Sequence, residues 1–326
     1  LKLLDRMQQP VNFGNAKVSG KARVEVLLKS NLTSDEITYE VKGTAKEFSS
    51  HVINPDFIIS NGTLDFFADK KGLEITGNAK VKDLPIQAKL LGSLAKEEPQ
   101  ILEIDFSLSE KVLEMLPDGF PEIKISGSAP AKLYLKFLES KKVEFDLVSD
   151  LKGVELSYLP IGWVKEMNGE AELKVSGTIG NEFVLNNVYL ISPSLALVGS
   201  AVQQKDENFM FNFEKLALED VFDIQLVIEK DGVLEVTGGE LDMQEFIKLP
   251  LAKNSSKKST PITIYLDELK LYEEQVITKF TAALEATGKG KFSGSLNDLA
   301  SFEGVLERVE EGLSLIHISE PTRPPE

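Results

Sequence analysis

Phe209-Met-Phe-Asn-Phe213 and Phe222-Asp-Ile-Gln-Leu-Val-Ile228 place an apolar residue at every second position. Because side chains alternate across a β-strand, each stretch forms a ribbon with one apolar and one polar face. The same alternation occurs over residues 133–137, 143–147 and 262–266, and glycine-rich turns separate the runs. The sequence therefore predicts a mostly β chain built as a long antiparallel sheet.

Internal similarity indicates that this sheet is repetitive. Residues 71–80 and 231–240 share a frame of glycine, a strand and Thr-Gly. In a repeat sheet each unit packs only on its neighbours, so the chain can lengthen without needing a new core.

Four segments and a tail are expected along the chain. Residues 1–108 form a β-repeat segment, and residues 109–250 form a second one that contains a short helix at about 109–116 and a Gly-Trp element. Residues 251–260 are a polar linker, and residues 261–312 continue the β-repeat. Ser109 is expected to cap the first helix, and Pro117 to end it.

Two further helical segments are expected. One runs from Asp242 to about Lys248, before Pro250, and the stretch from Val305 to Gly312 could start another.

Turn residues predict where strands reverse. Asn61-Gly62 suits a type I′ hairpin turn, because both positions tolerate a positive φ. Asp69-Lys-Lys-Gly72 predicts a second turn, and residues 188–202 are interpreted as two strands and a turn, since Ser192, Pro193 and Ser194 interrupt the apolar run.

The two ends of the chain need separate treatment. Leu313-Ser-Leu-Ile-His-Ile-Ser-Glu-Pro-Thr-Arg323 is what a common sequencing adapter encodes, so residues 313–326 are interpreted as an adapter-derived artefact. The chain starts at Leu1 in strand-like sequence, from which we expect an internal fragment of a longer protein.

Composition limits the partners and the chemistry. The formal net charge of −16, with acidic residues spread throughout, argues against nucleic acid as a partner. The cluster of Lys253, Lys257 and Lys258 is interpreted as a solvated linker, with a contact to lipid headgroups as the alternative. The chain has no cysteine, which excludes disulfides and thiolate metal sites.

The residues needed for catalysis are scarce. His51 is the one histidine outside the tail, and a triad, a histidine-rich zinc site or a histidine base would all need it. Asp65, Asp105, Asp146 and Asp223 alternate with apolar neighbours, as polar-face residues do. We therefore expect no enzyme activity, no catalytic residue, no metal site and no cofactor.

An ordered string of features over residues 101–296 resembles a known family. The helix at 110–116 and Pro117-Asp-Gly-Phe-Pro121 lead into further strands, then Ile161-Gly-Trp163 precedes Asn168-Gly169, and Gly238-Gly-Glu-Leu-Asp-Met243 precedes the second helix. This order is similar to that of the AsmA-like superfamily of bacterial envelope proteins, in particular its YhdP-like branch, with TamB more distant. The family's Leu-Gly-Trp element begins with Ile161 here.

The resemblance implies a fold, a place and a function. The fold would be an elongated, curved sheet with a U-shaped groove, periplasmic and anchored in the inner membrane of a double-membraned bacterium. The anchor would lie at the N-terminus, outside this fragment. Such proteins look like bridges that carry phospholipid towards the outer membrane, so phospholipid would be the partner of this chain.

The alternating apolar residues are the candidate lining of such a groove, although each of them could instead pack against protein. They are Val24, Val26, Leu102, Ile104, Phe106, Leu133, Leu135, Phe137, Val143, Phe145, Leu147, Leu173, Val175, Phe209, Phe211, Phe213, Phe222, Ile224, Leu226, Ile228, Ile262, Ile264 and Leu266.

Two alternatives to lipid transport stay open. The first is a structural or assembly scaffold of the envelope, in which protein seals the apolar face. The second is a β-helical carbohydrate-active enzyme, which would need carboxylates that converge in one cleft. The excess of phenylalanine, 18 residues against 6 tyrosines and 1 tryptophan, suits a dry core and a hydrocarbon-filled groove equally.

Overall fold

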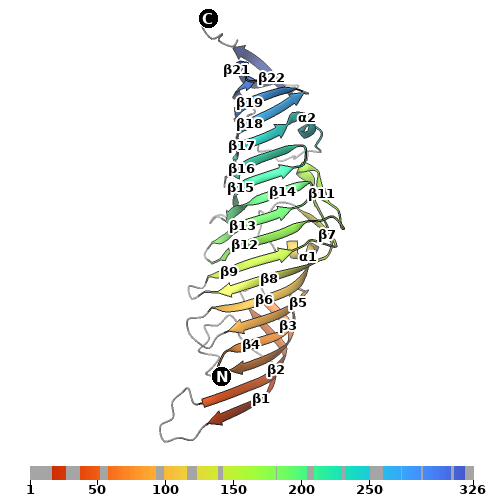
Figure 1. Ribbon diagram of the computed structural model, residues 1–326, viewed down its shortest axis with the longest axis vertical. Coiled ribbons are helices and arrows are strands. Elements are labelled where there is room, and N and C mark those ends of the chain that lie inside the picture. The colour runs from red at the N-terminus through yellow and green to blue at the C-terminus, as the bar shows by residue number, and fades with distance from the viewer. Residues whose placement is uncertain are drawn as a thin grey trace. The chain divides into compact units, whose positions relative to one another are not determined.

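The structure is a computed structural model, and it describes residues 17–26, 37–51, 58–92, 99–115, 123–138, 142–180, 182–203, 209–229, 232–249, 260–272, 274–287, 289–309 and 312–319. Most of these residues are in strands (Figure 1). The chain divides into two compact units.

The first unit contains residues Leu1–Met115, Ser128–Leu151 and Ser176–Asn181. Its successive strands pair antiparallel. They are β1 (Lys17–Val26), β2 (Ile37–His51), β3 (Ile58–Asp69), β4 (Leu73–Val81), β5 (Leu84–Gly92), β6 (Gln100–Leu108), β8 (Ala129–Phe137) and β9 (Val143–Ser149). The helix α1 (Glu110–Leu113) follows β6; Ser109 is its N-cap residue, but the Ser109 hydroxyl makes no capping bond.

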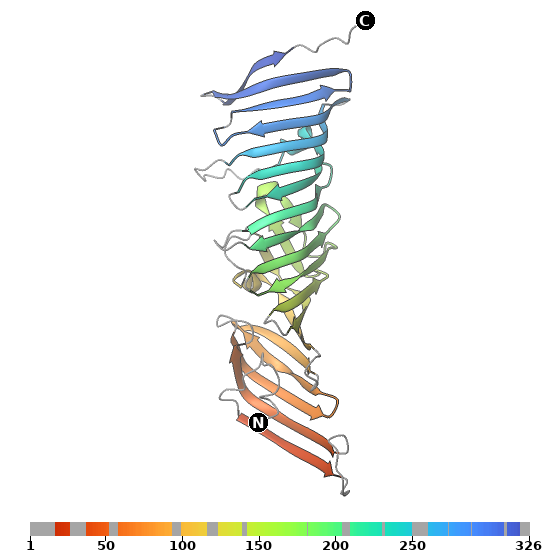
Figure 2. The same ribbon diagram turned by 90° about the vertical axis from the view of Figure 1, so that its left-hand side faces the viewer.

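The second unit contains residues Leu116–Gly127, Lys152–Val175 and Glu182–Glu326. Its large sheet holds strands that pair in chain order (Figure 2). They are β13 (Phe183–Ile191), β14 (Leu195–Gln203), β15 (Phe209–Leu218), β16 (Phe222–Ile228), β17 (Leu234–Asp242), β18 (Ile262–Tyr272), β19 (Gln275–Leu284), β20 (Gly290–Leu296), β21 (Ala300–Val309) and β22 (Gly312–Ser319). Residues 172–175 of β12 (Glu172–Ile179) also belong to this unit.

Two features of the second unit depart from a simple series of hairpins. The strands β17 and β18 pair in parallel, which requires a crossover, and the helix α2 (Met243–Phe246) begins that connection. A separate three-stranded sheet is formed by β7 (Lys124–Gly127), β10 (Val154–Tyr158) and β11 (Trp163–Lys165), with the 3-10 turn Leu159–Ile161 between the last two.

The predicted fold class, a mostly β chain with a curved antiparallel sheet and a few short helices, is confirmed. Among the described residues, β1 does not pair with β9, nor β13 with β22, so the sheet in each unit is open. Register shifts interrupt several pairs, and such bulges bend the strands that carry them.

Two predicted turns are confirmed. Asp69 Oδ1 accepts hydrogen bonds from the backbone N–H groups of Lys71 at 2.7 Å and Gly72 at 3.2 Å, which closes the reversal between β3 and β4. Residues 192–194 separate β13 from β14, and the Ser192 hydroxyl accepts from the Leu195 N–H at 3.0 Å.

The predicted hairpin turn at Asn61-Gly62 is wrong. Both residues lie inside β3, where the register against β2 shifts. Asn61 has a φ of +52°, so the positive φ that suggested a turn serves a bulge instead. A Cβ on Gly62 would come within 3.0 Å of the Phe48 side chain, which explains glycine at this buried position.

The expected start of a helix at Val305–Gly312 is also wrong. The strand β21 continues to Val309, Val305 pairs with Lys291 of β20, and β22 follows. Pairing with β20 outweighs a weak local preference for helix. The expected linker at 251–260 lies outside the described residues except for Thr260.

Candidate functional site

The sheet of the first unit has one continuous apolar face, called here the first apolar face. Residues that pair across neighbouring antiparallel strands share a face of the sheet. Leu90, Leu102, Leu135 and Phe145 form one row across β5, β6, β8 and β9. The next rows add the other candidates of these strands, which are Ile104, Leu133, Leu147, Phe106, Phe137 and Val143.

Burial differs along these rows. Leu135 is only 2% exposed, and Leu102, Ile104, Val143 and Phe145 are also buried. The other candidates in these rows are half-buried, so part of their surface stays accessible. They are Phe106, Leu133, Phe137 and Leu147.

The second unit has an equivalent surface, called here the second apolar face. Phe211 pairs with Ile228, which pairs with Leu234, which in turn pairs with Ile262. A second row starts at Phe213 and continues through Leu226, Val236 and Ile264. The remaining candidates of these strands, Phe209, Phe222, Ile224 and Leu266, lie on the same face by register or by alternation.

Four phenylalanines form an aromatic strip on the second apolar face. The rings of Phe209, Phe211 and Phe213 stack along β15 with centroids 5.7 and 5.8 Å apart, and the Phe183 ring meets Phe209 edge-on at 6.3 Å. Phe211 and Phe213 are half-buried, so this strip is dry on one side and accessible on the other. Phenylalanine suits such a surface because it has no polar atom to satisfy.

Phe213 also has a structural role. It pairs with Gly199 of β14, and a Cβ on Gly199 would lie 2.4 Å from Asn212 O and 3.0 Å from the Phe213 ring. The ring therefore occupies the space that a side chain at 199 would need.

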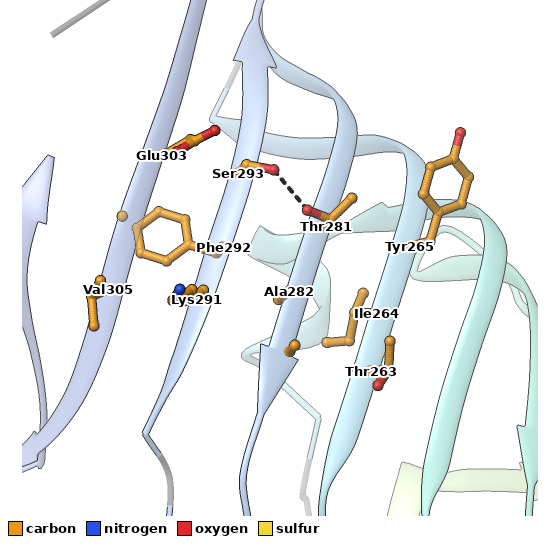
Figure 3. A pocket seen from close by; sticks show the side chains of 12 residues that line it. Thr263, Ile264, Tyr265, Thr281, Ala282, Lys291, Phe292, Ser293, Glu303 and Val305 are labelled. Atoms are coloured by element: carbon orange, nitrogen blue, oxygen red, sulfur yellow. Dashed lines mark hydrogen bonds between the residues drawn. The ribbon is translucent and has the colours of Figure 1, made fainter. Parts of the chain in front are cut away.

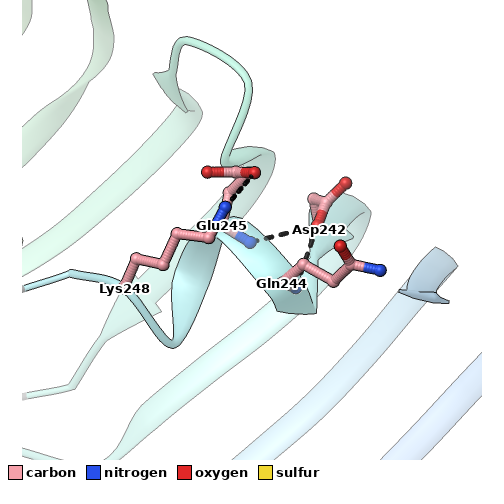
Figure 4. Close-up of polar contacts among 4 residues, drawn as sticks. All are labelled: Asp242, Gln244, Glu245 and Lys248. Atoms are coloured by element: carbon pink, nitrogen blue, oxygen red, sulfur yellow. Dashed lines mark hydrogen bonds and ion pairs between the residues drawn. The ribbon is translucent and has the colours of Figure 1, made fainter. Parts of the chain in front are cut away.

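The helix α2 meets the second apolar face at β17 and β18. The buried residues Leu266, Leu269 and Ile277 form a cluster against which Met243 packs. Asp242 Oδ1 accepts the N–H groups of Gln244 at 2.9 Å and Glu245 at 3.2 Å, and Lys248 pairs with Glu245 at 2.6 Å (Figure 4). These contacts hold the helix with Met243 on the cluster.

The three-stranded sheet meets the large one at the turn between β13 and β14. Trp163 is only 4% exposed, and its Nε1 donates to Ser194 Oγ at 3.2 Å. The adjacent Lys165 is buried too, with Nζ donating to Val154 O at 2.8 Å. The Gly-Trp element thus links the two sheets of the second unit.

The remaining candidates are less well placed. Leu173 and Val175 are half-buried on β12, where they alternate with exposed Glu172 and Lys174. The backbone of Val24 and Val26 is in β1, but their side chains lie outside the described residues.

Sequence reasoning missed many residues of both faces. Plain alternation would have found those on β4 and β5, whereas register shifts in β15 and β17 put Leu216, Leu218 and Leu241 out of step with the apolar residues before them. The missed residues include Ile75, Leu84, Ile86, Leu90, Leu185, Leu195, Leu197, Leu216, Leu218, Leu234, Val236, Leu241, Leu269, Ile277, Phe280, Phe292 and Phe302.

The opposite faces of the sheets are polar and carry ion pairs. Asp105 pairs with Lys132 at 3.4 Å, and Asp223 pairs with Lys215 at 2.6 Å. The hydrogen bond to Asp105 and its charge raise the pKa of Lys132 above the ordinary value. Asp65 accepts from the Thr44 hydroxyl at 2.7 Å, and Asp146 is exposed, so all four aspartates lie on the polar side as predicted.

A hollow of about 540 Å³ is lined by residues of β18–β21, among them Ile264 and Phe292 of the second apolar face (Figure 3). Thr281 and Ser293 are hydrogen-bonded at 2.7 Å within it, and Tyr265, Lys291 and Glu303 also line it. Glu303 lies opposite Ser293 in the register of β20 and β21. Across the described parts of the chain, no group of three or more His, Cys, Asp or Glu is placed to hold a metal ion. His51 is the last residue of β2.

Comparisons with known proteins found no matching family model, no matching curated protein and no matching solved structure. Within the described residues, no helix has the length and apolar character needed to cross a membrane.

Proposed function

We propose that this chain is a segment of an envelope-spanning bridge that shields phospholipid acyl chains in an apolar β-groove between the inner and outer membranes. It would be a periplasmic member of the AsmA-like superfamily, from the YhdP-like branch, anchored in the inner membrane. One observation carries the proposal. In each unit, the alternating apolar side chains gather on one face of an open sheet, and many of them are only half-buried.

A groove of this kind would avoid a large free-energy cost of exposing acyl chains to water. Exposing hydrocarbon to water costs about 0.8 kcal/mol per CH₂, so an acyl chain of roughly 16 carbons would cost on the order of 12 kcal/mol to move through water. Side chains such as Phe211, Ile224 and Leu226 offer apolar contact instead. A lipid in this position keeps its phosphate in water at the ends of the strands.

The arrangement of the faces supports sliding. Rows of leucine, isoleucine and phenylalanine repeat from strand to strand, so an acyl chain meets a similar surface at each step and no deep trap. The proposed transport needs no catalytic group.

Photo-crosslinking tests the proposal. A benzophenone side chain placed at Phe211, Ile224 or Leu226 is expected to form adducts with phospholipid in cells, because all three lie on the second apolar face. Met210 and Gln225 are exposed on the opposite face of the same strands and serve as matched controls. Adducts at the control positions alone would refute the proposal.

A scaffold without lipid conduction is the second candidate function. It is favoured by the near-complete burial of Leu135 and Leu266, each 2% exposed, and by the packing of Met243 on the second apolar face. In a scaffold, the crosslinker at Phe211, Ile224 and Leu226 would capture protein and no lipid.

A further inference from the structure

The hollow on β18–β21 has a row of polar side chains along one wall. Tyr265 pairs with Thr281, Thr281 with Ser293, and Ser293 with Glu303, so these four residues form one row across four strands. Tyr265 follows Ile264 of the second apolar face along β18. Because side chains alternate along a strand, the row projects from the opposite, polar face. An aromatic ring, two hydroxyls and a carboxylate therefore line the hollow on this side (Figure 3).

A second row on the same face forms the other wall. It contains Lys291 and Val305, which pair with each other across β20 and β21. Ile264 and Phe292 lie between the two rows, so their backbone forms the floor. The hollow is thus a trough on the polar face, and its volume is within the range of about 300–1,000 Å³ that is typical of ligand sites.

The backbone under the trough is already hydrogen-bonded. The strands β18 to β21 each pair with a neighbour on both sides. An extended peptide that binds a sheet through its main chain needs a free strand edge. A ligand of this trough must therefore bind through side chains.

These side chains suit a sugar. Tyr265 is 39% exposed, which leaves part of its ring open for stacking. Thr281 Oγ1 and Ser293 Oγ are 2.7 Å apart, so one hydroxyl donates to the other and the second keeps its proton for a ligand. The exposed Glu303 carboxylate accepts hydrogen bonds, and it disfavours an anionic ligand. A sugar ring matches all of these groups, because it has C–H groups on its faces and hydroxyls around its edge.

A hollow of about 660 Å³ lined by residues of β1–β4 provides a contrast. Its aromatic ring, Phe67, has Lys42 Nζ at 5.1 Å from the ring centroid. Its carboxylate, Asp65, accepts from the Thr44 hydroxyl at 2.7 Å. Among the described residues no cation lies over the Tyr265 ring, so of these two rings Tyr265 is the one that is available to a ligand.

We propose that the trough on β18–β21 binds a short stretch of uncharged polysaccharide, with one sugar ring stacked on Tyr265 and its hydroxyls bonded to Ser293 and Glu303. The site goes beyond the proposed function, since it lies on the face opposite to the proposed lipid groove. In the periplasm, where the proposed function places the chain, such sugars come from the glycan strands of the cell wall or from glycolipids bound for the outer membrane.

Saturation-transfer NMR on the purified chain tests the site with three probes. A β-linked tetramer of N-acetylglucosamine represents the cell wall, a dephosphorylated core oligosaccharide represents the glycolipids, and glycerophosphoethanolamine represents a phospholipid headgroup. Binding of at least one oligosaccharide is expected, and the one that binds more tightly identifies the source. Binding of the headgroup alone would overturn the proposal.

Variants locate the binding in the trough. Tyr265→Ala is expected to weaken oligosaccharide binding about tenfold, because the stacking surface is lost, whereas Tyr265→Phe keeps the ring and should stay within about twofold of the wild type. Glu303→Gln is expected to weaken binding about fivefold, because a carboxylate accepts stronger hydrogen bonds than an amide does. Tyr272→Ala is the matched control and should keep the wild-type affinity, since Tyr272 is 62% exposed at the end of the same strand and outside the hollow.

Two further results would overturn the site. One is a wild-type chain that binds neither oligosaccharide, and the other is equal affinity of the wild type and Tyr265→Ala. Circular dichroism checks that each variant keeps its sheet, and Glu303→Gln decides if Tyr265→Ala fails to fold. Crosslinking to lipid on the second apolar face is measured separately, so the sugar site and the lipid groove can fail independently.

Discussion

Gly239 shows how a single residue permits the bending of a strand. Its φ is +105°, and a Cβ at this position would lie 2.1 Å from Asp223 O on the neighbouring strand β16. Any other residue would meet both a strained backbone and a backbone clash. Gly239 lies two residues after Thr237, the extra residue of the β17 bulge opposite Gln225 and Leu226.

Gly239→Ala is therefore expected to lower the free energy of unfolding by about 3 kcal/mol. Urea unfolding followed by circular dichroism measures the change. Gly180→Ala is the control, since a Cβ there meets only the Lys142 side chain, at an ordinary 3.4 Å. Equal stability of Gly239→Ala and the wild type would show that the bulge tolerates a side chain.

An ion pair on the polar face of the first unit leads to a prediction about the pH dependence of stability. The hydrogen bond with Asp105 and the charge of Asp105 raise the pKa of Lys132 above 10.5. Because the pKa is raised by folding, the contribution of this pair to stability is complete below pH 10.5 and is lost as the pH rises through the folded-state pKa. NMR titration of Lys132 Nζ should give a midpoint above 10.5, and Asp105→Asn should lower it. A midpoint unaffected by Asp105→Asn would contradict this cause.

At the scale of elements, bulges decide which side chains share a face. In β15 the candidates Phe209, Phe211 and Phe213 occupy every second position. Leu216 and Leu218 lie on the same face, but three residues separate Phe213 from Leu216 where alternation predicts two. Glu214 is the extra residue that causes the shift. A strand with such a residue bends, so the same feature that hides the alternation also curves the sheet.

The helix α2 depends on the capping side chain of Asp242. Asp242→Ala removes the acceptor for two N–H groups of its first turn and is expected to destabilise the protein by about 1 kcal/mol. Asp242→Asn keeps an acceptor and should cost less. Thermal unfolding of both variants measures the difference, and equal losses would mean that the charge, and not the cap, matters.

For the whole molecule, the proposed groove predicts an effect of charge. Phe211→Asp places a carboxylate in the aromatic strip, where an acyl chain would have to pass an ionised group that retains its water. Lipid transfer between donor and acceptor vesicles is expected to fall at least about tenfold, with the β-sheet spectrum preserved. Asn212→Asp places the same charge on the polar face of β15 and should leave transfer unchanged. Equal transfer by both variants would show that lipid does not pass over the aromatic strip.

The sequence predicts which candidate residues share a face better than it predicts where the strands turn. All ten candidates between Phe209 and Leu266 share one face in the structure, because alternation with a period of two is a local property of each strand. The turn at Asp69 is equally local, since its carboxylate bonds the backbone two and three residues ahead. The Asn61 prediction failed because a positive φ suits a turn and a bulge alike.

By itself the sequence determined the strand class, the two-faced character of the strands and the residue types available for chemistry, because these follow from composition and from neighbours along the chain. Only the tertiary structure decided the registers, the bulges, the parallel pairing of β17 with β18, and the burial of Gln100 at the end of an apolar row. Those features depend on which strands pair across long separations in sequence. No local pattern contains that information.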